Sequence, residues 1–389
     1  MPRSDQGTVV FTTAISDTAK ILAPENTMEL PQMAAKTAEK ILDTRLPNRL
    51  ENEGAKETLA RRESFGDTVT NNNVDVEEER PRKFLLEELS YLPLAITQAA
   101  AYIKRNKISI SSYLDLKFEQ KGKTTNLSNR KSEQQLRHHN ADMAVAITTL
   151  ISLKDVSRQN PMAANCLFFM ARVDRKDVLV QLLPTAPSSP VKTTVDLLST
   201  YAILIKRPAS SAVELHRLVH LAIRNYLQER ALFYQWNQIA IGILAKKFPS
   251  ASYENRSKWR RLLPHAICAL ADSSVEQRSD SIYNLYSRIW KCLRVDGRNR
   301  EAMDCFERCD SWRKTTLDET HPSRLVSQHA LAVAYRVNGQ VGKAVKLLET
   351  VVAIKSTTLD ETHSDRLASE GWLAYILREL HLGTRIAQE

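Results

Sequence analysis

The segment "TTLDETHPSRL" (315–325) recurs as "TTLDETHSDRL" (357–367), so that Thr315 and Thr357 mark a repeat of 42 residues. The same offset pairs further residues upstream: Gly297 with Gly339, Ala302 with Ala344, and Phe306 with Leu348. Internal repeats of this length with helical patterns are typical of α-solenoids, whose helical hairpins bury their apolar faces only against neighbouring hairpins. We therefore predict a helical repeat array over residues 281–389, with the last repeat incomplete.

Details of the repeat predict how it packs. Small residues at Ala332, Gly339 and Ala344 predict close helix approach. The recurring "LDETH" could be read as a metal-binding cluster, but its recurrence at the repeat period favours a loop in which Asp and Thr cap the next helix. An incomplete last repeat would expose apolar surface, and self-association would be the consequence.

Composition agrees with a mostly helical chain. Of its 389 residues, 43% are hydrophobic, and only 10 are glycine. The net charge is +10, but Lys and Arg alternate with acidic residues along helical patterns, so we do not expect a nucleic-acid partner. The five cysteines form no CxxC pair, and no signal peptide or membrane span is visible. We expect a cytoplasmic protein without a membrane partner.

Upstream of the repeats the pattern changes several times. "TVVFTTA" (8–14) predicts a strand, and the polar residues 47–80 predict a flexible linker. From Pro81 onward helical spacing returns, with Pro93 in the first turn of a second helix. Ser111 or Ser112 would cap a third, short helix.

A compact region follows the polar residues 117–140, which predict an exposed linker. Within it, "YAILIKRPASSAVELHRLVH" (201–220) contains two β-rich runs around a Pro-Ala-Ser-Ser turn and leads into a helix. Helices followed by a small hairpin indicate a winged helix over residues 141–230. Winged helices can bind DNA, but many serve only as packing modules.

The pair His216 and His220 has the spacing of zinc ligands in H-E-x-x-H sites. Arg217 stands where such a site needs its glutamate, and no third ligand follows at fixed spacing, so we reject a zinc site.

"KGKTT" (121–125) imitates the end of a P-loop, but Lys117 stands where the first glycine is required. We expect a solvated loop there.

Taken in order, "VVFTTA", "YLPLAI", "ELHRLVHLAIRNYL" and the 42-residue repeats resemble the fungal STAND-type NTPases. Those proteins carry an NB-ARC nucleotide-binding module followed by tetratricopeptide repeats of the kinesin-light-chain type. The resemblance covers about residues 8–45 and 81–389 and implies an N-terminally truncated member.

The resemblance implies four nucleotide-contacting positions. Thr12 and Thr13 match the T-T-R strand, with Ala14 in place of the sensor arginine. Pro93 matches the adenine-packing proline of G-L-P-L, with Tyr91 in the glycine position. His216 matches the M-H-D histidine that contacts the β-phosphate of ADP. His220 is then a helix neighbour facing the core or solvent.

The departures imply loss of catalysis. The P-loop and the Walker B acid lie upstream of the T-T-R strand in that family, and this sequence begins almost at that strand. Phosphoryl transfer needs those parts for positioning and charge. We therefore expect no enzymatic activity, no metal site, and ADP as the one candidate cofactor.

We thus predict a mainly α protein with a remnant of an α/β nucleotide-binding domain. Its predicted parts are the NB-ARC remnant (1–46), a flexible linker (47–80), an ARC-like helical domain (81–116), an exposed linker (117–140), a winged helix (141–230), a helical spacer (231–280) and tetratricopeptide repeats (281–389). The predicted function is a non-enzymatic signalling scaffold that binds a protein or peptide through the repeat groove. Two alternatives stay open: a residual ADP-binding regulatory switch, and a basic winged-helix nucleic-acid binder.

Overall fold

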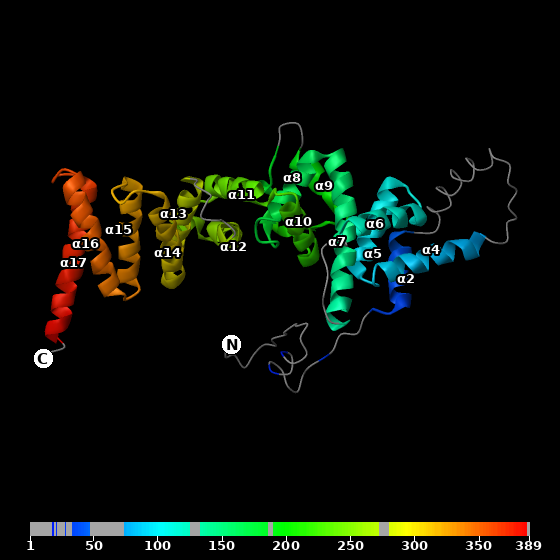
Figure 1. Ribbon diagram of the computed structural model, residues 1–389, viewed down its shortest axis with the longest axis horizontal. Helices are drawn as coiled ribbons and strands as arrows, with labels where there is room; N and C mark the ends of the chain where they lie inside the picture. The colour runs from blue at the N-terminus through cyan, green and yellow to red at the C-terminus, as the bar shows by residue number, and fades with distance from the viewer. Residues whose placement is uncertain are drawn as a thin grey trace.

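The computed structural model describes residues 33–46, 74–124, 133–185, 190–271 and 280–386, together with Thr18, Ile21 and Met28. The described chain is mainly α-helical, which confirms the predicted fold class. Its helices succeed one another along a long axis, from α2 and α4 at one end to α16 and α17 at the other (Figure 1). Among the described helices, none combines the length and apolarity that a bilayer crossing requires. The predicted strand at 8–14, with Thr12 and Thr13, lies outside the described residues.

The first helices form a small bundle: α2 (Ala35–Arg45), α4 (Val74–Glu88), α5 (Pro93–Asn106) and α6 (Ile110–Thr124). Pro93 occupies the first turn of α5 as predicted, where its missing N–H costs no hydrogen bond. The prediction that Ser111 or Ser112 caps α6 is wrong. Ser109 Oγ accepts from the Ser112 amide at 3.1 Å, because a capping side chain bonds an amide two or three residues further on.

Both predicted linkers are partly helical. The linker at 47–80 ends in the first turns of α4, which begins at Val74 and continues through Pro81. Glutamates and an arginine fill those turns and are good helix formers, while Leu85 and Leu86 anchor the helix in the core. Residues 47–73 lie outside the described part of the chain.

The linker predicted at 117–140 is wrong over its described ends, because α6 continues to Thr124 and α7 begins at Glu133. Lys117 is buried and its Nζ donates to the Glu88 backbone carbonyl at 2.9 Å and to the Glu88 carboxylate. Because of this ion pair, a charged residue occupies the inner face of α6. The helix therefore lacks a continuous apolar stripe by which it could be recognised in the sequence. "KGKTT" therefore begins as the last turn of α6, which is neither the expected loop nor a phosphate cradle.

The next unit combines four helices with a small sheet. The helices are α7 (Glu133–Gln159), α8 (Pro161–Met170), α9 (Val191–Thr200) and α10 (Arg217–Glu229). The strands are β1 (Val178–Leu179), β2 (Leu204–Arg207) and β3 (Ala212–Leu215), antiparallel in the order β1-β3-β2. A 3-10 turn (η3, Pro208–Ser210) joins β2 to β3, so the predicted hairpin and following helix are confirmed. The short β1, which a 3-10 turn (η2, Val180–Leu182) follows, was not predicted.

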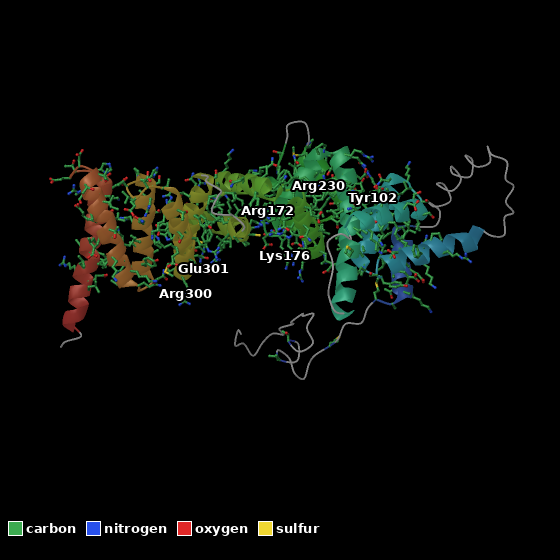
Figure 2. The ribbon with its side chains drawn as sticks, in the orientation of Figure 1. Tyr102, Arg172, Lys176, Arg230, Arg300 and Glu301 are labelled. Atoms are coloured by element: carbon green, nitrogen blue, oxygen red, sulfur yellow. The ribbon has the colours of Figure 1, made fainter. Side chains whose placement is uncertain are left out.

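Residues 231–280 contain α11 (Phe233–Lys247), a 3-10 turn (η4, Tyr253–Asn255) and α12 (Arg256–Ala271). Several contacts join them to the sheet unit, and two of these involve buried or bidentate arginines. Arg172, labelled in Figure 2, is fully buried, donates to Asn237 Oδ1 at 2.9 Å and lies 3.6 Å from the Phe233 ring centroid. Arg261 on α12 forms a bidentate ion pair with Asp177, at 2.7 and 2.8 Å.

The C-terminal helices are α13 (Asp280–Val295), α14 (Asn299–Thr316), α15 (Pro322–Val337), α16 (Val341–Thr358) and α17 (Ser364–Ile386). One apolar core runs from Ala38 in α2 to Ala302 in α14, and smaller clusters hold the later helices. Ala332 and Ala344 are fully buried where α15 meets α16, which confirms the predicted close approach. Gly339 has another role: its φ of 76° makes the turn between these helices.

Candidate functional site

The repeat array is regular at the level of single side chains. The helices α13, α15 and α17 begin at positions 280, 322 and 364, so each start lies 42 residues after the last. Equivalent residues of α14 and α16 are buried in the same order: Ala302 with Ala344, Phe306 with Leu348, and Cys309 with Val351. The spacing of four and then three residues places each set on one helix face. The period seen in the sequence therefore corresponds to a repeated interface.

A buried cation recurs at the end of each of these stripes. Arg313 donates to the Ser323 carbonyl, and Lys355 Nζ donates to the equivalent Asp365 carbonyl at 2.9 Å. Lys355 Nζ also bonds Ser369 Oγ at 2.9 Å. These carbonyls lie in the first turn of the next helix, so each cation ties one repeat to the following one.

The "LDETH" loops are structural, as predicted, but histidine provides the cap in place of Asp or Thr. His321 Nδ1 accepts from the Ser323 amide and His363 Nδ1 from the Asp365 amide, each at 3.2 Å. Among the described residues, no cluster of three His, Cys, Asp or Glu side chains could hold a metal ion.

His216 has the same local geometry as these two histidines. It caps α10, and its Nδ1 accepts from the Leu218 amide at 3.2 Å. An imidazole that accepts at Nδ1 is neutral and carries its proton at Nε2. Much of the ring faces solvent, but desolvation of its inner part lowers the pKa of His216, and the charge of Arg175 adds to this effect. His216 is thus a helix cap with an Nε2–H that a phosphate oxygen could accept.

His220 faces the core. Its Nε2 lies 3.2 Å from the Val173 carbonyl, and burial lowers the pKa of the ring. Its Nε2, one of the two ring nitrogens that a zinc ion could bind, therefore faces a backbone carbonyl.

Pro93 begins α5 next to an unusual turn. Tyr91, which stands in the glycine position of the resemblance, has φ of 53°, and Ser90 has φ of 52°. Glycine adopts this left-handed region without strain, whereas a tyrosine there costs of order 1 kcal/mol. The backbone therefore keeps the conformation that a glycine would favour. Pro93 itself is exposed, and its helix packs on α7, as does α10.

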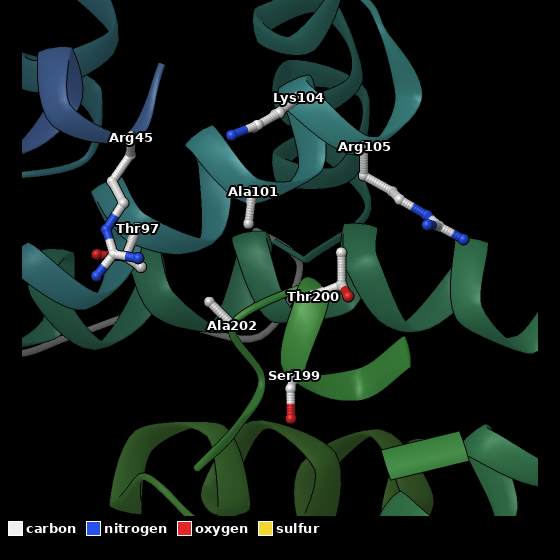
Figure 3. Close-up of a pocket in the computed structure, with 8 residues that line it drawn as sticks. All are labelled: Arg45, Thr97, Ala101, Lys104, Arg105, Ser199, Thr200 and Ala202. Carbon is white, nitrogen blue, oxygen red and sulfur yellow. The ribbon is translucent and has the colours of Figure 1, made fainter. Parts of the chain in front are cut away.

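A cavity of about 450 Å³ lies further along α5 (Figure 3). Its lining residues come from α2, α5 and the end of α9: Arg45, Thr97, Ala101, Lys104, Arg105, Ser199, Thr200 and Ala202. Figure 3 shows Arg45 and Lys104 on one side of it, while the Arg105 and Ser199 side chains point away. Thr97 Oγ1 donates to the Pro93 carbonyl at 2.7 Å, so the cavity begins one turn after Pro93. Its positive charge suits an anion, but neither Pro93 nor His216 lines it.

The two cations of the β2–β3 hairpin are held in ion pairs. Lys206 pairs with Asp196, and Arg207 pairs with Glu214 at 3.0 Å. Each cation of the hairpin thus has a carboxylate partner within the protein.

Comparisons with known proteins place these features in context. A nucleotide-binding leucine-rich repeat (NLR)-like protein of Hyaloscypha variabilis is 29% identical over 334 residues, 85% of this chain. The chain spans 31% of that relative's length. Two crystal structures of kinesin light chain nearly identical TPR-like repeats from Podosopora anserina are 27% and 26% identical, and each covers 43% of this chain and 87% of its own, with a TM-score of 0.29. No family model matches the chain. The chain is a mainly helical repeat protein that is similar, over most of its length, to an NLR-like protein, in agreement with the resemblance inferred from the sequence.

Proposed function

We propose that this chain is a non-enzymatic signalling scaffold of the cytoplasm, which binds a protein or peptide through its helical repeats. One observation carries the proposal: equivalent interior positions of the repeats stay apolar, while two equivalent surface positions reverse their charge. Glu301 and Asp304 are exposed on α14, and the equivalent positions on α16 hold the exposed Lys343 and Lys346. Figure 2 labels Glu301 on this surface. An apolar interior that recurs beneath a local reversal of surface charge suits a platform that recognises a partner of definite charge pattern.

Affinity capture with a matched pair of variants tests this proposal. Lys343→Glu with Lys346→Glu reverses the charge on α16, and Lys36→Glu with Lys40→Glu reverses two exposed lysines on α2. Quantitative mass spectrometry should show partners that are lost from the first variant and kept by the second. Identical partner profiles for all three proteins would count against recognition by the repeats.

A direct turnover assay tests the expectation that the chain is not an enzyme. We expect no turnover of ATP or GTP with Mg²⁺ by the purified chain. Turnover that His216→Ala abolishes would contradict a purely non-enzymatic scaffold.

A residual ADP-binding switch is the second candidate, because the sensor-like Nε2–H of His216 and the cationic cavity next to the Pro93 turn both suit a phosphate. Calorimetric titration with ADP tests it. Binding that both His216→Ala and Pro93→Ala weaken would support a nucleotide site, whereas the absence of binding would leave the scaffold function alone.

A further inference from the structure

The cavity between α2, α5 and the end of α9 contains two cations without a partner. Arg45 on α2 and Lys104 on α5 lie along one side of this cavity, which measures about 450 Å³ (Figure 3). Within the part of the chain that the structure describes, neither side chain forms a hydrogen bond or an ion pair. The described residues that line the cavity include no Asp or Glu. The positive charge of the cavity wall is therefore not compensated from within.

The carboxylates on the same helices are engaged by other cations. Asp43, which precedes Arg45 on α2, pairs with Arg82. Asp196 on α9 pairs with Lys206. Because both acids are held in this way, an anion that enters the cavity is attracted by the two lining cations and meets little repulsion.

Stabilisation of helix ends accounts for only part of this arrangement. Arg45 and Lys104 lie in the last turns of α2 and α5, where a cation interacts favourably with the helix dipole. The ends of α2, α5 and α9 each carry roughly half a negative charge, which together is less than the two full charges of Arg45 and Lys104. Lys246, in the last turn of α11, has the same relation to its helix and lines no part of this cavity. The dipole thus explains each cation alone, but not why two of them share one cavity.

The chemistry of the lining favours phosphate as the anion. Thr97 Oγ1 and Thr200 Oγ1 already donate to the carbonyls of Pro93 and Asp196, at 2.7 and 2.9 Å, so the attraction must come from the cations. A phosphate group carries about two negative charges and has three accepting oxygens, and an arginine fork binds it in a bidentate manner. Two linked phosphates supply one such group for each lining cation.

We propose that this cavity binds a small molecule with a diphosphate group, held by Arg45 and Lys104. The inference goes beyond the proposed scaffold function, because no residue of the repeats takes part. It is also separate from the ADP-binding switch, which requires Pro93 and His216, since neither lines the cavity. A ligand at this position joins the first helical bundle to the end of α9 in the sheet unit.

Calorimetric titration of the full chain with inorganic pyrophosphate at low ionic strength tests the proposal. We expect saturable binding that Arg45→Gln and Lys104→Gln each weaken at least about three-fold, because each removes one of the two charges. Lys246→Gln removes an exposed lysine from the last turn of α11; it is the matched control and should bind like the unchanged protein. Pro93→Ala and His216→Ala should also keep pyrophosphate binding. Circular dichroism confirms that each variant is folded.

Parallel titrations with ADP identify the source of the diphosphate. ADP that binds more tightly than pyrophosphate, and that Arg45→Gln weakens, would support the cavity with a nucleotide as its ligand. Equal affinities, both weakened by Arg45→Gln, would support it with a diphosphate that is recognised without a base.

Four results would overturn the proposal. One is no saturable binding of pyrophosphate to the folded protein. Another is an equal loss in Lys246→Gln, which would indicate a response to net charge alone. The third is binding that Pro93→Ala and His216→Ala weaken and Arg45→Gln does not, which would place the phosphates at the nucleotide position. The fourth is tighter binding of citrate than of pyrophosphate, because the site would then select carboxylates.

Discussion

Replacing His216 by alanine separates its capping role from any role in nucleotide sensing. The substitution removes the hydrogen bond that Nδ1 accepts from the Leu218 amide at 3.2 Å. Loss of a side-chain N-cap costs about 1 kcal/mol, within a range of roughly 0.5–2 kcal/mol. A loss of 1 kcal/mol raises the local opening of the first turn of α10 about five-fold. His216→Asn keeps a capping acceptor and should stay close to the unchanged protein.

The assay is hydrogen–deuterium exchange of the amides at the start of α10, measured without nucleotide. His321→Ala is the internal standard, because His321 caps α15 with the same 3.2 Å geometry. Both alanine variants should speed exchange in their own helix by a similar factor. If His321→Ala has this effect and His216→Ala leaves exchange unchanged, the capping explanation for His216 is wrong.

The cap at α10 should also weaken in acid. A protonated ring cannot accept at Nδ1, and partial burial with the nearby Arg175 lowers the pKa of folded His216 below its usual value of about 6.5. The unfolded chain therefore takes up the proton more readily. The stabilisation is fully present above about pH 6.5 and is lost as the pH falls through the lower folded pKa. In His216→Ala, the protection of the α10 amides relative to their intrinsic exchange rate at each pH should not fall in this way.

Three further predictions concern stability and reactivity. Gly339→Ala should lower the free energy of unfolding in urea by about 1 kcal/mol, because the φ of Gly339 is 76°. Ala231→Gly should raise it by roughly 0.5 kcal/mol, because Ala231 has a φ of 56° that glycine adopts without strain. If both substitutions changed the free energy of unfolding in the same direction, the backbone argument would be wrong. A double-mutant cycle of Asp177→Ala and Arg261→Ala should give a coupling free energy of about 1 kcal/mol at neutral pH, and a coupling of zero at pH 7 would refute this. The hydrogen bond from Arg261 lowers the pKa of Asp177. The coupling is therefore present above about pH 3.9 and is lost as the pH falls through the lower pKa of the folded protein. Burial raises the pKa values of four thiols to about 11 or 12: Cys166, Cys292, Cys305 and Cys309. Their alkylation at pH 8 should therefore be slow until urea unfolds the chain, and rapid labelling of the folded protein would refute this.

The repeat array was predictable because two segments 42 residues apart, 315–325 and 357–367, have nearly identical sequences. The hairpin after α9 was predictable because β-rich runs flank a proline turn. The end of α6 was not, since a buried Lys117 paired with Glu88 looks like a surface lysine in a sequence. β1 was not predictable either, because a strand of two residues is too short to show an alternation of apolar and polar residues.

The candidate site was only partly predictable for a similar reason. The sequence marked His216 by its place in a motif, yet its bond to the Leu218 amide depends on the three-dimensional turn before α10. The exposure of Leu367 could not be recognised from residue type, because Leu367 and Leu325 lie in similar sequence contexts and yet are 52% and 3% exposed.

The continuous core from α2 to α14 and the separate small clusters beyond it make the molecule mechanically uneven. Under tension between the two ends, α17, α16 and α15 can peel away one after another, because each packs on the nearest helices of the array, as α17 does on α16 and, through the Arg336–Glu379 ion pair, on α15. The helices that share the large core must yield together, at a higher force. A force–extension trace would therefore begin with short steps, as single repeat helices unfold, and end with one long step. A pulling force on the chain would unfold the repeats before it unfolded the helices around His216.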